Sequence, residues 1–148
     1  MDWQMAGLST IYGWLVAEQM PQAVSASVVL HNWALITAPR KAVYGQITAA
    51  TLAQLVVDNG KALFERNIRH YLGSVGVNTA IEETVRRRPG DFFYLNNGIT
   101  AVVQTLTQAG GTQAHCTFGL ENVSIVNGAQ TAGAIANAAA AGHISPDA

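Results

Sequence analysis

The sequence contains a single cysteine, Cys116, among its 148 residues. One thiol cannot form a disulfide framework within the chain, and it excludes zinc sites that are built from several cysteines. A lone thiol fits a reducing compartment, and we therefore expect a cytoplasmic protein. No residue that could act as a base is assignable to Cys116, so we expect it in the core.

Long uninterrupted apolar runs are also missing. Four polar residues interrupt the most apolar stretch, 24–36. It therefore falls short of the roughly 18 apolar residues that indicate a membrane span. The first seven residues carry Asp2 and no basic residue, unlike a secretory signal. The sequence predicts no membrane segment.

Charge is scarce and unevenly distributed. Charged residues make up 11% of the chain, less than half of the roughly 25% that is typical, whereas 49% of residues are hydrophobic. This shortage indicates a surface that the rest of a longer protein, or a partner, covers. All eight Lys and Arg lie before residue 89, and the net charge is −1. Any site for an anion must therefore be local.

The first part of the chain predicts strands followed by helices. The stretch 25–36 is rich in β-branched residues, as in a strand, and the later segments repeat apolar residues three and four positions apart, as in helices. Thr48 is a typical helix N-cap, and Pro89-Gly90 should end the last helix. Two strands and three helices are predicted at 25–36, 43–47, 48–59, 61–72 and 78–88, the last of them opened by Asn78-Thr79.

Beyond Gly90 the pattern changes to strands and glycine turns. Asn96-Asn97-Gly98 is typical of a tight turn between two strands, and Gly110-Gly111 of a second turn. Strands are predicted at 91–95, 99–107, 115–118 and 123–126, before an Ala-rich helix from Asn127-Gly128 to about Ala141. Together these elements predict an α+β fold, with a small, mostly antiparallel sheet packed with three to four helices.

Three polar segments interrupt the apolar chain. The first motif, LFERNIRHYLG at 63–73, places Arg66, Arg69 and His70 on one side of a helix, with Asn67 beside them. Such a face can bind an anion. The same pattern is also typical of a solvated amphipathic helix. Taken alone, this segment favours that second interpretation.

The other two segments are built around glycine. The second motif, YLNNGIT at 94–100, permits a left-handed turn that exposes backbone N–H groups, although a plain hairpin turn fits its spacing better. The third motif, IVNGAQT at 125–131, is a strand, a glycine turn and a helix start, a geometry that binds phosphate. The alternative is that Asn127 simply caps the helix. Neither segment matches a P-loop or a dinucleotide-binding fingerprint.

Taken in order, these segments resemble the AIPR family, the abortive-infection phage-resistance proteins. The resemblance covers residues 63–131 and includes Val77-Asn78 leading into Ile81 and Thr84, and the string FFYLNNGIT at 92–100. It implies one bacterial antiphage defence domain over 1–148. Family members are usually longer than this chain, which implies an N-terminal or truncated piece that a missing C-terminal region or another subunit completes.

A more distant likeness concerns ParB-like and DGQHR-type domains. Those domains hold a nucleoside triphosphate, with magnesium, between an early helix and a glycine turn. The likeness implies that Asn67 and Arg69 face the phosphates and that Gly128 and Gln130 form the second wall. Thr131 stands where those domains carry a basic residue, so the likeness does not extend to triphosphate hydrolysis.

These resemblances lead to one main hypothesis, a phage-defence domain that binds a nucleotide or another phosphate ligand. The residues predicted to line the site are Asn67, Arg69, Asn97, Gly98, Asn127, Gly128, Gln130 and Thr131. The alternative is a non-catalytic module that binds nucleic acid or a phage protein through Arg66, His70, Arg86, Arg87 and Arg88. A third reading, part of a nuclease effector, lacks an acidic cluster in this chain. No catalytic residue is assigned, and the four histidines lack the spacing of metal ligands.

Overall fold

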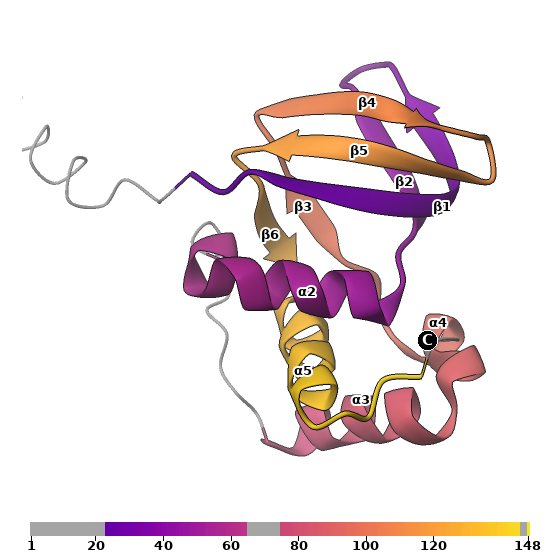
Figure 1. Ribbon diagram of the computed structural model, residues 1–148, viewed down its shortest axis with the longest axis vertical. Helices are drawn as coiled ribbons and strands as arrows, with labels where there is room; N and C mark the ends of the chain where they lie inside the picture. The colour runs from indigo at the N-terminus through magenta and orange to yellow at the C-terminus, as the bar shows by residue number, and fades with distance from the viewer. Residues whose placement is uncertain (1–22, 65–74, 146–147) are drawn as a thin grey trace, which may run out of the picture.

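The computed structural model describes residues 23–64, 75–145 and 148. A four-stranded sheet forms one layer and the helices form the other, with two short strands between them (Figure 1). The elements in chain order are β1 (Ala26–Ile36), β2 (Ala42–Gln46), α2 (Ala49–Asn59), the 3₁₀ helix η1 (Gly60–Phe64), α3 (Val75–Arg87), the 3₁₀ helix η2 (Pro89–Asp91), α4 (Phe92–Leu95), β3 (Thr100–Val102), β4 (Thr105–Gly111), β5 (His115–Glu121), β6 (Ser124–Asn127) and α5 (Ala129–Ala140).

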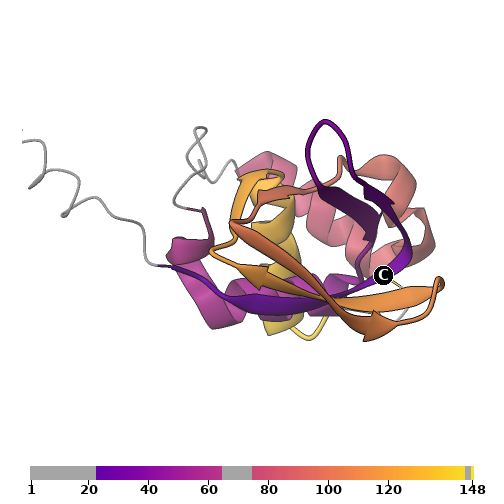
Figure 2. The ribbon, with the colours of Figure 1, turned by 90° about the horizontal axis from the view of Figure 1, so that it is seen from above.

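Every strand pairing in the described part of the chain is antiparallel. The larger sheet has the order β2-β1-β5-β4, and β3 pairs with β6 in a second sheet. The predicted α+β class is therefore confirmed, and so are the strand over 25–36 and the edge strand after it. Figure 2, seen from above, shows β1 crossing over α2 and α5.

The two sheets are halves of one bent hairpin. In the outer half Thr105 lies opposite Glu121, and in the inner half Val102 lies opposite Ser124. At the bend, Asn122 has a positive φ of 51°, and its Nδ2 donates to Gln104 Oε1 at 3.3 Å. The single strand expected over 99–107 is therefore wrong. The bend divides this predicted strand into β3 and β4. Beyond the bend, β3 and β6 leave the larger sheet and lie against the helices.

The helix boundaries follow local capping. The Thr48 side chain accepts a hydrogen bond from Thr51 N at 3.2 Å, which confirms Thr48 as the N-cap of α2. Gly60, with a φ of 56°, ends this helix as predicted. Helix α3 begins at Val75, so its predicted start at Asn78-Thr79 is wrong. Of the helix predicted over 61–72, residues up to 64 belong to η1, and the remainder lies outside the described residues.

The segment after Pro89 differs most from its prediction. Residues 91–95 do not form a strand, because Pro89 starts η2 and the chain continues directly into α4. Asn96 stabilises this turn, since both its backbone N–H and its side-chain amide donate to the Phe92 carbonyl at 3.2 Å. Asn96-Asn97-Gly98 therefore links a helix to β3 and is not a hairpin turn. Gly110-Gly111 ends β4, and the turn predicted there lies at 112–114.

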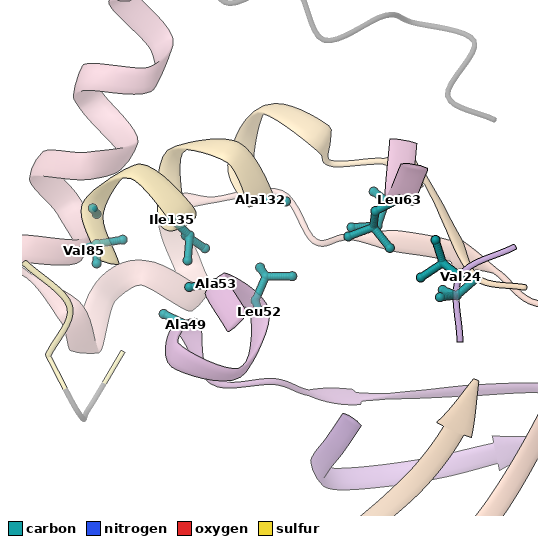
Figure 3. Close-up of a cluster of buried hydrophobic side chains, with 11 residues drawn as sticks. Val24, Ala49, Leu52, Ala53, Leu63, Val85, Ala132 and Ile135 are labelled. Carbon is teal, nitrogen blue, oxygen red and sulfur yellow. The ribbon is translucent and has the colours of Figure 1, made fainter. Parts of the chain in front are cut away.

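The main core lies between the helices and the inner strands. Helix α5 contacts both α2 and α3, and its small alanine side chains allow these helices to approach closely. Figure 3 shows Ile135 between Val85 of α3 and the α2 residues Ala49 and Ala53. A smaller cluster under the sheet contains Val28, Phe118 and Cys116, which is 1% exposed, so the core position predicted for this thiol is confirmed.

Candidate functional site

The second and third motifs meet at the end of the β3–β6 pair. Thr100 lies opposite Asn127, and the register shifts at the next position. A Cβ atom added at Gly128 would stand 2.8 Å from Ile99 Cγ1 and 2.9 Å from the Gly98 carbonyl oxygen. Only glycine fits this approach without a shift of its neighbours. The structure therefore brings Gly98 and Ile99 of the second motif into contact with Gly128 of the third motif.

Gly128 is also the residue from which helix α5 begins. Its φ of 84° and ψ of 19° are left-handed, and it is the N-cap, without a side-chain capping bond. The alternative interpretation of Asn127 as the cap is therefore wrong. The N–H groups in the first turn of a helix have no intrahelical acceptor, and they carry the positive end of the helix dipole. This end of α5 is suited to an anion.

Three polar side chains at this junction make no hydrogen bond to another described residue. Asn97 and Asn127 are exposed, and neither side chain makes a hydrogen bond to another described residue. Thr131, in the first turn of α5, is 9% exposed, and its hydroxyl likewise has no hydrogen-bond partner among the described residues. A buried hydroxyl without a partner costs about 1–3 kcal/mol, so an acceptor supplied by a ligand would be favourable here. Gln130 is half-buried beside it.

One expectation for the second motif is wrong. None of Asn96, Asn97 and Gly98 has a positive φ, so this segment does not form the left-handed turn that would expose consecutive N–H groups. The left-handed residue of the site is Gly128. The position of Gly98 is instead open, because an added Cβ there would meet no atom within 4 Å.

The first motif begins next to the third. Leu63 is completely buried, and its carbonyl oxygen accepts a hydrogen bond from Ser124 Oγ at 3.2 Å. Ser124 starts β6, the strand that leads to Asn127. The residues of this motif that were predicted to bind phosphate or nucleic acid lie outside the described residues and stay predictions: Arg66, Asn67, Arg69 and His70.

The second and third motifs carry no cationic side chain. No Lys or Arg occurs after Arg88, so the second and third motifs offer only amide, hydroxyl and N–H donors. Arg86, Arg87 and Arg88 are all exposed. Arg86 and Arg87 lie in the last turn of α3, where cations interact favourably with the helix dipole, and Arg88 follows the helix. Arg87 Nε lies 3.5 Å from Glu83 Oε1 in an exposed pair, which contributes at most about 0.5 kcal/mol.

Two hollows lie elsewhere in the described part of the chain. One hollow of about 300 Å³ lies between the start of β1 and α2, lined in part by Ser25, Thr51 and Asp58. Another, of about 510 Å³, lies between α2 and the end of α5. Neither is lined by residues of the three motifs. No group of three or more His, Cys, Asp or Glu within the described ranges could hold a metal ion.

Two residues that position the backbone of the site were not predicted from the sequence. Ile99 contacts the backbone at Gly128, and no sequence signal identifies it beyond its place in the second motif. Ser124 links the first and third motifs, and a lone polar residue between Val123 and Ile125 in an apolar strand is a signal that could have found it. Both residues position the backbone of the site.

A comparison with family models matches the AIPR protein family over residues 64–146, more than half of the chain. The chain belongs to the AIPR protein family. The matched region starts in the first motif and includes the second motif, the third motif and α5. This membership supports an abortive-infection, antiphage defence domain.

The remaining comparisons add no relative. No curated protein and no protein of solved structure matches the chain. The likeness to ParB-like domains therefore stays a prediction. None of the helices in the described part of the chain is both long enough and apolar enough to span a bilayer.

Proposed function

We propose that this AIPR domain binds a nucleotide or another phosphate ligand where Asn97-Gly98 meets Asn127-Gly128. The observation that carries the proposal is the contact of Gly128 with Gly98 and Ile99. It places two polar, glycine-containing segments at the N-terminal end of a 12-residue helix. Helix N-termini preceded by a glycine turn are common phosphate sites, because N–H groups and the helix dipole act on the same anion.

Each group at the junction has a distinct role in this proposal. The first-turn N–H groups of α5 and the Thr131 hydroxyl donate to phosphate oxygens. Asn97 and Asn127, whose amides both donate and accept, hydrogen-bond a base or sugar. In this proposal Arg69 of the first motif supplies positive charge, with Asn67 as a neutral hydrogen-bonding group, and magnesium adds charge if the ligand is a triphosphate. The proposal assigns these residues a role in binding the ligand and no role in breaking a bond.

Thermal unfolding in the presence of nucleotides tests the proposal. The purified chain is titrated with ATP, CTP and GTP, with and without Mg²⁺. A ligand at a hundredfold excess over its dissociation constant adds about 2.7 kcal/mol of stability. For a chain of this size, the Tm should then rise by about 5–10 °C.

Two substitutions locate the effect. Asn127→Ala and Arg69→Ala should each reduce or abolish the rise in Tm. Asn137→Ala, at the exposed far end of α5, and Arg40→Ala, in the loop before β2, should leave it unchanged. A folded chain whose Tm responds to none of the three nucleotides contradicts the proposal. So does a rise that persists in both Asn127→Ala and Arg69→Ala.

A further inference from the structure

Helix α4 presents aromatic side chains to solvent. Phe93 is 65% exposed, Tyr94 81% and Leu95 55%. The two rings contact each other edge to face, with centroids 5.4 Å apart. Three consecutive large apolar side chains at this exposure are unusual in a surface segment that has no partner, and they indicate a binding surface.

Three arginines lie immediately before these rings. Arg86 and Arg87 end α3 and Arg88 follows them, so that η2 alone lies between these arginines and α4. The turn is tight, since Asp91 N donates to the Arg88 carbonyl at 3.0 Å, and η2 contacts both helices. Figure 1 shows the chain passing from the end of α3 directly into α4. The exposed guanidinium groups and the exposed rings therefore belong to one corner of the molecule.

We propose that this corner is a binding surface for single-stranded nucleic acid. Bases stack on Tyr94 and Phe93, and phosphates contact Arg86 and Arg88. Exposed aromatic rings beside cations are the usual combination in proteins that bind single strands, because every base offers a flat face and every linkage a negative charge. The surface is separate from the phosphate site proposed above, and it does not depend on that site.

Two of the three arginines at the corner make no ion pair with another described residue. Arg87 pairs with Glu83, but neither Arg86 nor Arg88 has an acidic partner within 4 Å among the described residues. A purely apolar protein partner would leave these two guanidinium groups unpaired at its edge. Nucleic acid provides acceptors for both.

The same stretch also predicts how binding depends on salt. Glu82, Glu83 and Asp91 balance the three arginines, so the net charge over 82–91 is zero. Stacking should therefore contribute more than long-range attraction. With one or two phosphate contacts, the slope of log K against log salt should be only about −0.7 to −1.4.

Fluorescence anisotropy with labelled oligo(dT), oligo(U) and a duplex of equal length tests the proposal. The full chain should bind both single strands more tightly than the duplex, whose bases are already stacked. Tyr94→Ala should weaken single-strand binding by between about fivefold and a hundredfold. Tyr94→Phe, which keeps the ring, should bind like the unchanged chain.

Matched controls separate stacking and charge from general surface effects. Tyr44 in β2 is 61% exposed, and Tyr44→Ala should not alter the affinity. Replacing both Arg86 and Arg88 by alanine should flatten the salt slope by about 0.7 to 1.4, whereas Arg40→Ala should not change it. All these side chains are exposed, and circular dichroism verifies that each variant is folded.

Three outcomes would overturn the proposal. The first is a folded chain that binds neither single strand at low salt. The second is an equal loss of affinity in Tyr94→Ala and Tyr44→Ala. The third is self-association in sedimentation that Tyr94→Ala abolishes, without any oligonucleotide binding, which would make the corner a contact between copies of the chain.

Discussion

Gly128 lies so close to Ile99 that a Cβ atom at position 128 would stand 2.8 Å from Ile99 Cγ1. The two residues belong to motifs that are nearly thirty positions apart in sequence. The β3–β6 pairing brings them together, and it fixes the polar residues around them at the start of α5. This junction is the basis of the proposed phosphate site.

Gly128→Ala should destabilise the fold strongly. The substitution combines a left-handed φ of 84°, which costs a non-glycine residue about 1–2 kcal/mol, with a steric clash that costs about 1–3 kcal/mol. Gly142→Ala is the matched control, because its φ is 72° but its Cβ would meet no atom within 4 Å. Urea unfolding should show a larger loss for Gly128→Ala. Equal losses would mean that the close approach to Ile99 does not exist.

Thr131→Val should separate binding from stability. Its hydroxyl is buried and has no hydrogen-bond partner among the described residues, so removing it should leave the free energy of unfolding unchanged or raise it by up to about 1 kcal/mol. The nucleotide-dependent rise in Tm should be lost. Thr84→Val provides the contrast, because Thr84 Oγ1 donates to the Ala80 carbonyl at 2.9 Å and its loss should cost about 1 kcal/mol. A large destabilisation by Thr131→Val would contradict this assignment.

Leu63→Ala should reveal how much the first motif contributes to the core. Leu63 is completely buried among the residues of the main cluster, and truncating it should cost about 2–5 kcal/mol. Leu95→Ala, at a position that is 55% exposed, should change the free energy of unfolding by less than about 0.5 kcal/mol. Chemical denaturation of the two variants measures both values. Similar losses in both would show that Leu63 is not a core residue.

Local signals in the sequence were sufficient for several elements. The β-branched run of β1 and the capping residues Thr48 and Gly60 each act on their own neighbours, so short-range patterns identify them. The glycine turn before α5 was predicted for the same reason. The polar, glycine-containing pattern also identified the second and third motifs, and the family resemblance was drawn from them, although the sequence did not indicate how they pack together.

Turn chemistry and cross-strand contacts explain where prediction from the sequence failed. Residues 92–95 are apolar and aromatic, as in a strand, but the turn that Pro89 begins and Asn96 closes holds them in a helix. The bend at Gln104 and Asn122 depends on a cross-strand pair, and no local pattern marks it. The hydrogen bond from Ser124 to the Leu63 carbonyl and the burial of Thr131 depend on the whole fold, so the sequence did not predict them.

The most direct test of the phosphate site is an amide NMR titration of the isotope-labelled chain with ATP, CTP and GTP in the presence of Mg²⁺. The chain, at 15.6 kDa, is small enough for assigned spectra. The account predicts that the largest shifts caused by one of these nucleotides fall on the amides of Asn97–Thr100 and Gly128–Thr131. Shifts centred instead on the hollow beside Thr51 and Asp58, or no shifts at saturating nucleotide, would contradict it.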